Sequence, residues 1–338
     1  MQSKVKRLWQ LCFDDSEAFT DLYFRMRYTE EVNIALCEGE EVVAALQMLP
    51  YPMTFCGGEL RTAYVSGACT HPDYRNRGLM RRLLTQAFVE MRSKGVEVTT
   101  LIPAEPWLFD YYAQSGYAAV FCKGEEVFRA GGVTGEPLPL ERADAYREDV
   151  YRYLADKQHE RPCSLLHTEE DFKVVLADLA LSGGHVYLLR RMGAIVALAV
   201  AYPSDASAEG GQQWHLEEVL ADSTAFRTCL LQQLCCELRV PSLSVSVPDP
   251  EGAPLGMARI IHAPAVLQRY AAAHPRLTAS FRLVDEQLPA NDGYYCLHDG
   301  QCTTPSSPAS TDVPTLNIAQ LTERLFGPLH PYMCLMMN

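Results

Sequence analysis

The chain has 338 residues, of which 48% are hydrophobic and 21% are charged. This composition excludes a disordered chain, and the length predicts roughly two or three globular units. The 42 acidic and 29 basic side chains give a formal net charge of −13, which disfavours binding to nucleic acid and to anionic membranes. A cationic amine substrate fits that sign, although an acidic surface also serves solubility alone.

The twelve cysteines are scattered through apolar runs and show neither C-x-x-C nor metal-ligand spacing. This pattern favours reduced, buried thiols over disulfides and predicts no metal site. The N-terminal residues contain no apolar segment of the kind found in signal peptides, and no run of about 18 apolar residues follows. We therefore expect a cytoplasmic protein.

The first third of the chain predicts a helix, a strand meander, and then alternating helices and strands. Residues 14–26 place apolar side chains on one helical face. Residues 78–94 repeat apolar side chains at helical spacing and stop at Gly95. The predicted strands are residues 33–38, 42–49, 60–69, 96–102 and 117–121, with a short aromatic helix at residues 107–114.

Residues 131–139 are dense in Gly and Pro and predict a linker. The segment behind it repeats the strand-strand-strand-helix-strand order of the first third, which indicates an internal duplication. The predicted helices here are residues 140–157, 168–181 and 224–238, and the predicted strands are residues 185–190, 194–202, 214–220 and 242–247.

From residue 254 the chain predicts a smaller unit with helices at 265–273 and 318–326 and strands at 277–284 and 293–298. The last residues, 332–338, are apolar, and we expect this tail to be buried because exposed termini are usually polar. The sequence therefore predicts an α+β fold with mixed sheets flanked by helices. Its predicted domains are residues 1–130, 131–253 and 254–338.

A basic loop separates the third strand of the meander from the helix that follows it. The strand stops at His71 and Pro72, and a turn role explains His71 without a catalytic one. At the start of the helix the backbone N–H groups and the helix dipole favour an anion such as a pyrophosphate, and Gly allows close approach. The predicted anion site comprises Arg75, Asn76, Arg77, Gly78, Leu79 and Met80.

The loop has an alternative interpretation, in which Gly78 only forms a turn and the arginines are solvated. The surrounding strand and helix pattern favours the anion site, since a motif gains weight from its context. In the second copy the equivalent segment, 221–226, lacks glycine and carries Asp222. An anion is disfavoured there, so the second copy is expected to be structural.

The R-x-x-G-x-x loop after a strand ending in Thr70-His71-Pro72, followed later by Gly116-Tyr117, resembles the GNAT superfamily. The whole chain is similar to the enhanced intracellular survival (Eis-like) family, which has tandem GNAT domains and a C-terminal unit similar to a sterol carrier protein. The second GNAT-like domain would lack the coenzyme loop. The resemblance implies an acetyl-CoA-dependent N-acetyltransferase that works in a ternary complex and forms homo-oligomers.

The resemblance also implies roles for particular residues. Backbone groups of Ala68, Cys69 and Thr70 would hold the pantetheine arm and the acetyl carbonyl of acetyl-CoA. The Tyr112 phenol would protonate the departing thiolate, and the C-terminal carboxylate of Asn338 would accept the amine proton. Three alternatives remain: Cys69 as a nucleophile, Tyr111 in place of Tyr112, and a tail that only completes a sheet.

The acceptor site is assigned to Asp15, Glu17 and Phe19 at the first helix, with Trp107 as an apolar wall, although helix capping also explains Asp15. Relatives acetylate aminoglycosides and other polyamines. Here no carboxylate stands beside the terminal one, so a small amine is the expected acceptor. The competing hypotheses are a coenzyme A-binding protein without turnover and a lipid carrier, for which a small C-terminal domain leaves little room.

Overall fold

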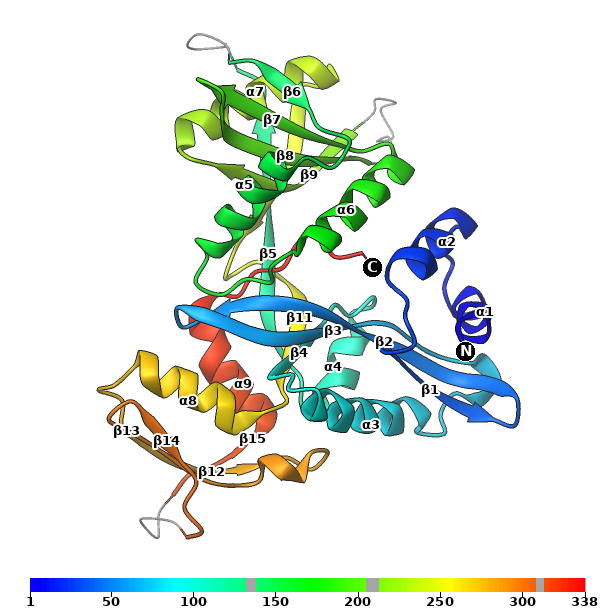
Figure 1. The fold of residues 1–338 in the computed structure, drawn as a ribbon, viewed down its shortest axis with the longest axis vertical. Coiled ribbons are helices and arrows are strands. Elements are labelled where there is room, and N and C mark those ends of the chain that lie inside the picture. Colours follow the sequence, from blue (N-terminus) through cyan, green and yellow to red (C-terminus); the bar gives the residue numbers. More distant parts are fainter. Residues whose placement is uncertain (132–137, 205–212, 308–312, 338) are drawn as a thin grey trace.

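The computed structural model describes residues 1–131, 138–204, 213–307 and 313–337. The chain is arranged in three lobes (Figure 1). One contains the N-terminal helices and strands, the second contains the middle of the chain, and the third contains most of the residues after 260. The C-terminal segment returns from the third lobe and runs between the other two.

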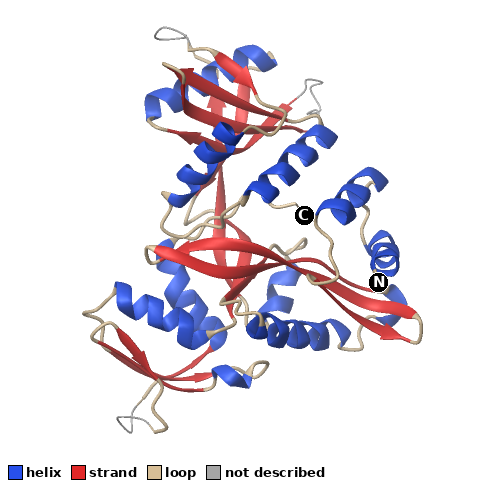
Figure 2. Ribbon diagram, in the orientation of Figure 1, coloured by secondary structure: helices blue, strands red, loops and turns tan. Residues whose placement is uncertain are grey.

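A large mixed sheet of eleven strands joins the first two lobes. Its strand order is β1-β2-β3-β4-β11-β5-β10-β9-β8-β7-β6. Two separate sheets were expected, but the long strand β5 (Ala118–Arg129) pairs with β11 (Ala253–Ile260) along one edge and with β10 (Ser242–Pro248) along the other. Because β5 belongs to both halves, the two sheets are continuous (Figure 2).

The N-terminal lobe packs helices on both faces of a long hairpin. Helices α1 (Gln2–Cys12) and α2 (Glu17–Met26) cover one face, and α3 (Leu79–Ser93) and α4 (Trp107–Ala113) cover the other. Helix α1 was not predicted from the sequence, and it buries Val5, Leu8 and Trp9. The strands are β1 (Asn33–Glu38), β2 (Glu41–Phe55), β3 (Gly58–Thr70) and β4 (Val98–Leu101).

Strand β11 is the largest departure from the expected organisation. It starts at the predicted boundary of the C-terminal unit, yet it lies in the large sheet between β4 and β5. Met257 pairs with Leu101 on one side and with Ala119 on the other. The N-terminal part of the sheet is therefore closed by a strand that follows the whole second lobe in sequence.

The second lobe contains the repeated order that the sequence predicted, with one correction. The expected helix over residues 140–157 is helical only from Glu148 to His159, and Leu140–Arg142 forms strand β6, paired with β7. The helices are α5 (Glu148–His159), α6 (Glu169–Ser182) and α7 (Thr224–Leu238), and the remaining strands are β7 (His185–Arg191), β8 (Ala194–Ser204) and β9 (Gln213–Ala221).

The C-terminal lobe has a four-stranded mixed sheet in the order β14-β13-β12-β15. Helix α9 lies between this sheet and the large sheet, and the tail after it is buried as predicted, with Tyr332 and Met333 at 3% and 1% exposure. None of the described helices is long and apolar enough to span a bilayer. The elements are α8 (Ala263–Ala273), β12 (Ala279–Val284), β13 (Gly293–His298), β14 (Gln301–Thr303), β15 (Thr315–Asn317) and α9 (Ile318–Phe326).

The contact of α9 with the hairpin predicts a stability effect. Phe326 is fully buried, and its ring centroid lies 5.0 Å from that of Phe55 on β2. We expect Phe326→Ala to lower the free energy of unfolding by about 3–5 kcal/mol, because it removes buried area and leaves a cavity. Urea denaturation measures this. Leu181→Ala, at a side chain that is 43% exposed, should change it by less than about 0.5 kcal/mol; equal effects would contradict the packing.

Candidate active site

Strands β3 and β4 run parallel, but they pair over a short length only. Thr62, Ala63 and Tyr64 pair with Val98, Thr99 and Thr100. Beyond Tyr64, β3 continues to Thr70, whereas β4 ends at Leu101. The two strands therefore part at their carboxyl ends, which is where ligands bind in sheets of parallel strands.

A β-bulge shapes β3 at this position. The register with β2 shifts between Ala45 and Gln47, opposite Ser66 and Cys69, and Gly67 within the bulge has φ +58°. A Cβ on Gly67 would lie 2.1 Å from Cζ3 of Trp9 and 2.4 Å from Oε1 of Gln47. Only glycine fits at this position. The bulge bends β3 and changes the direction of the residues that follow, Ala68 to Thr70.

The basic loop has the geometry of an anion site. Gly78, with φ +71°, is the N-cap of α3; no side chain caps the helix, and a Cβ there would meet nothing within 4 Å. The first N–H groups of α3 are thus available to a ligand. Arg75 and Arg77 are exposed and are held by the loop itself, since Nε of Arg75 donates to the Thr70 carbonyl at 3.3 Å and Nη2 of Arg77 donates to the Asp73 carbonyl at 2.9 Å.

The corresponding helix of the second lobe is closed to an anion. The Ser223 hydroxyl accepts from the Phe226 backbone N–H at 3.2 Å and so caps α7. The Asp222 carboxylate stands beside it, paired with Lys157 at 3.1 Å. The Ser223 hydroxyl satisfies an N–H group at the start of α7, and the Asp222 carboxylate supplies the negative charge that the helix dipole favours. A bound anion is therefore not needed there.

Tyr112 lies on α4 in the same apolar cluster as Ala68 and Met80. It is 8% exposed, and its ring centroid is 5.8 Å from that of Tyr117. Burial raises the pKa of the Tyr112 phenol, so the group stays protonated at neutral pH. Tyr111 on the same helix is only half-buried and stacks edge-on with Trp107, at 6.3 Å between ring centroids.

Two cysteines meet at the end of β3. Cys69 is 6% exposed, and a hydrogen bond with Cys12 together with burial raises the pKa of its thiol. A thiol with a raised pKa is a poor nucleophile, which favours the structural interpretation of Cys69. The Cys69 hydrogen bond and the nearby Arg75 guanidinium lower the pKa of Cys12 to about 7. The Cys12 thiol also donates to the Thr70 carbonyl at 3.4 Å.

The residues predicted for the acceptor do not form one group of contacts. Asp15 accepts a hydrogen bond from the Trp9 indole at 2.7 Å, Glu17 is exposed in the first turn of α2, and Phe19 packs partly against the core. Trp107 is 63% exposed at the start of α4, and among the described residues its ring contact is with Tyr111. These assignments remain predictions, and Asn338 lies outside the described residues.

His71 has the turn role predicted for it. Its Nδ1 accepts from the Asp73 backbone N–H at 3.3 Å at the start of a short 3-10 turn, Pro72–Tyr74. This contact leads the chain from β3 into the basic loop. His71 therefore shapes the approach to the basic loop.

Sequence reasoning missed a polar row beneath α2. Gln47 is fully buried in β2 and is bonded to Asn33 at 3.0 Å and to the Tyr23 hydroxyl at 3.4 Å. Further along, Nη1 of Arg27 pairs with Asp171 at 2.5 Å. A Gln inside the apolar run 42–49 was the available signal, because buried polar side chains need partners.

The buried tail is held by the second lobe. The Leu165 N–H donates to the Tyr332 carbonyl and the Tyr332 N–H to the Cys163 carbonyl, both at 3.0 Å. The His167 ring approaches the Leu335 carbonyl at 3.3 Å. These hydrogen bonds attach the C-terminal tail to the second lobe.

Comparison with known proteins gives a family match for the N-terminal part of the chain. Residues 2–120 match the family described as the acetyltransferase (GNAT) domain. No curated protein sequence matches the chain significantly. The N-terminal part of the chain is therefore a GNAT acetyltransferase domain.

Solved structures share the fold over nearly the whole chain. A GCN5-related N-acetyltransferase from Anabaena variabilis has a TM-score of 0.79 and 14% identity, covering 95% of this chain and 86% of that one. One from Kribbella flavida has a TM-score of 0.74 and 20% identity, covering 99% and 95%. Eis1 from Mycobacterium abscessus has a TM-score of 0.71 and 14% identity, covering 96% and 87%.

The bulge predicts a specific effect of substitution. We expect Gly67→Ala to lower the free energy of unfolding by about 2 kcal/mol or more, through left-handed strain and overpacking against Trp9. Gly39→Ala is the matched control, because Gly39 has φ +62° and nothing within 4 Å of its Cβ. Denaturant titration compares the two variants, and an equal loss in both would argue against close packing at the bulge.

The lowered pKa of Cys12 predicts selective alkylation. The thiolate fraction rises as pH increases through about 7, so at about pH 8 iodoacetamide should label Cys12 before Cys56 and Cys302. Cys56 and Cys302 are partly buried comparison thiols, since burial raises the pKa of each to about 11. Peptide mass spectrometry measures the rates. Labelling of Cys56 or Cys302 before Cys12 would overturn the assignment.

Proposed function

We propose that the protein transfers an acetyl group from acetyl-CoA to the amine of a small molecule, by direct attack in a ternary complex. The observation that carries the proposal is the parting of β3 and β4 beside a helix that begins at glycine without a side-chain cap. This arrangement combines an anion site with exposed strand edges. An acyl-CoA donor needs both, because it carries a pyrophosphate and an amide-containing arm.

The residues present fit such a donor. The backbone N–H groups of residues 77–80 and the side chains of Arg75 and Arg77 would hold the pyrophosphate. Gly78 leaves the space in front of the helix open. The edge of β3 at Ala68, Cys69 and Thr70 would hold the pantetheine arm. The donor supplies the reactive thioester, and no metal is required for the proposed step.

The chemistry assigned to the protein is positioning and proton transfer. A neutral amine attacks the thioester carbonyl, forming the new C–N bond, and the C–S bond then breaks. N–H groups of β3 stabilise the negative charge on the carbonyl oxygen. Tyr112 gives its proton to the departing thiolate and is left as a phenolate. Burial keeps the phenol protonated before this step but also makes it a weaker acid, so the assignment rests on the resemblance and on the place of Tyr112 in the cluster with Ala68 and Met80.

The amine must lose a proton in the same reaction. The resemblance assigns its acceptor to the carboxylate of Asn338, and this remains part of the proposal. Met337, next to it, is 6% exposed in the core cluster that also contains Tyr23 and Tyr64. Asp15, Glu17, Phe19 and Trp107 are proposed as acceptor contacts, and homo-oligomerisation is proposed from the resemblance.

Substitution of Tyr112 tests the assignment of the acid. We expect Tyr112→Phe to reduce kcat by about 100-fold with little change in the KM for acetyl-CoA, because a general acid contributes about that much. The assay follows thiol release from acetyl-CoA with a panel of small amines.

Tyr111→Phe is the matched control, since it removes a neighbouring hydroxyl from the same helix. The proposal expects this variant to retain activity. If instead Tyr111→Phe loses activity and Tyr112→Phe keeps it, the acid is Tyr111. Tight coenzyme binding without turnover for any amine would favour a binding protein over the proposed transferase.

A further inference from the structure

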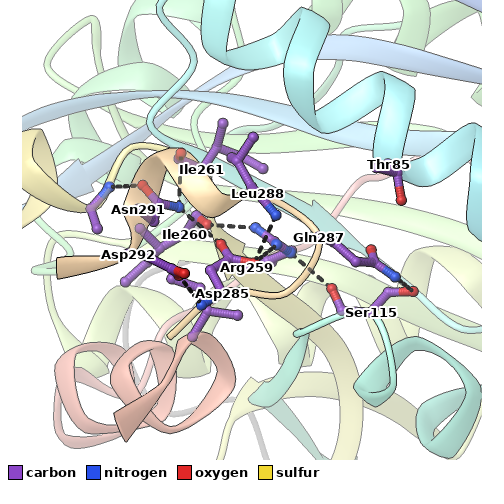
Figure 3. A network of polar contacts seen from close by, with 12 residues as sticks. Thr85, Ser115, Arg259, Ile260, Ile261, Asp285, Gln287, Leu288, Asn291 and Asp292 are labelled. Carbon is purple, nitrogen blue, oxygen red and sulfur yellow. Dashed lines mark hydrogen bonds and ion pairs between the residues drawn. The ribbon is translucent and has the colours of Figure 1, made fainter. Parts of the chain in front are cut away.

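A buried arginine on β11 connects three parts of the chain (Figure 3). Arg259 is fully buried, and its Nε donates to the Ser115 carbonyl at 2.8 Å. Its Nη1 donates to the Ile260 carbonyl at 2.9 Å, and its Nη2 pairs with Asp285 of the C-terminal lobe at 2.6 Å. One guanidinium thus bonds the α4–β5 turn, its own strand and the third lobe.

The turn that Arg259 holds is the turn that ends the helix of Tyr112. The Ser115 N–H donates to the Tyr112 carbonyl at 2.9 Å, and the Tyr117 N–H donates to the same carbonyl at 3.3 Å. Gly116, with φ +81°, leaves room for the contact, because a Cβ there would lie 3.1 Å from Nε of Arg259. Displacement of the Arg259 side chain would remove the hydrogen bond that holds the Ser115 carbonyl in this turn.

The same guanidinium also lies over α3. Its central carbon is 4.1 Å from the ring centroid of Phe88, on the helix whose N-terminus is the anion site. Arg259 therefore contacts α3, which begins at the proposed pyrophosphate site, and the turn that follows α4, which carries the proposed acid. One side chain thus joins these two elements.

Asp285 is itself held rigidly. It is 2% exposed, and its carboxylate accepts from the Leu288 N–H at 3.1 Å and from the Asn291 amide at 3.0 Å. Asn291 in turn accepts from Nη1 of Arg92, on α3, at 2.7 Å. A buried ion pair with satisfied hydrogen bonds holds its geometry firmly, and loss of one partner leaves an uncompensated charge.

We propose that Arg259 is a positioning residue for Tyr112, and that the C-terminal lobe sets the position of this phenol through Asp285. The inference rests on the proposed function for its effect on turnover. The contact chain itself, from Asp285 through Arg259 and the Ser115 carbonyl to α4, is independent of the acceptor. The third lobe thereby contributes to the active site without contacting a substrate.

The test compares Arg259→Lys and Asp285→Asn with Ser280→Ala. Lysine keeps the charge but cannot make the divergent bonds of the guanidinium, and asparagine keeps the shape of Asp285 without its charge. The matched control removes a hydrogen bond of the same lobe, from the Ser280 hydroxyl to the Cys296 sulfur at 3.3 Å. That bond involves none of Arg259, Asp285 and Asn291.

Two readouts apply to each folded variant. The first is the split between kcat and the KM for acetyl-CoA. The second is the 19F spectrum of the full chain with 3-fluorotyrosine at position 112, which reports on the phenol without any turnover. Circular dichroism and the affinity for coenzyme A establish that a variant is folded and retains its binding site.

We expect Arg259→Lys and Asp285→Asn to lower kcat by about tenfold or more at a nearly constant KM, because small misplacements of catalytic groups are costly. The fluorine resonance should shift in both variants and stay unchanged in Ser280→Ala. An unchanged resonance in both variants, or the same shift in the control, overturns the inference. If the wild-type chain acetylates no amine, the proposed function fails, while the resonance still decides whether Arg259 positions Tyr112.

Discussion

Strand β11 pairs with β4 on one side and β5 on the other, and most of the architecture follows from this pairing. Without it, β4 and β5 would not belong to one sheet. The strand arrives after the entire second lobe, so the N-terminal domain is completed by residues far away in sequence. Long-range pairing of this kind carries an entropic cost, which the buried contacts of Arg259 and the α9 core help to offset.

The proposed active site uses the parts of that sheet where pairing stops. Parted strands leave backbone groups for a ligand, and the bulge at Gly67 interrupts the β2–β3 pairing just before Cys69 and Thr70. The helix that follows begins at Gly78 and leaves its N–H groups without a side-chain cap, whereas the equivalent helix of the second lobe is capped by Ser223. The same order of elements thus occurs once with an uncapped helix start and once with a capped one.

Local patterns predicted much of this site, and long-range pairing limited the rest. The basic loop, α3 and the buried tail could be predicted from spacing and polarity, since each depends on neighbouring residues. Helix α1 was missed although Val5, Leu8 and Trp9 have helical spacing. Strand β11 was missed because Pro254 and Gly256 interrupt it and its partners are remote. The segment 140–142 is a strand because β7 offers it an edge, which no local pattern reveals. The Arg259 network likewise depends on three distant segments.

The central claim is that an acyl-CoA donor binds where β3 and β4 part, with its pyrophosphate at the start of α3. A crystal structure of the chain with coenzyme A tests this most directly. The account predicts the pyrophosphate against the backbone N–H groups of residues 77–80 and the coenzyme sulfur beside the Tyr112 hydroxyl. Coenzyme bound elsewhere, or a sulfur far from Tyr112 with the start of α3 free, would contradict it.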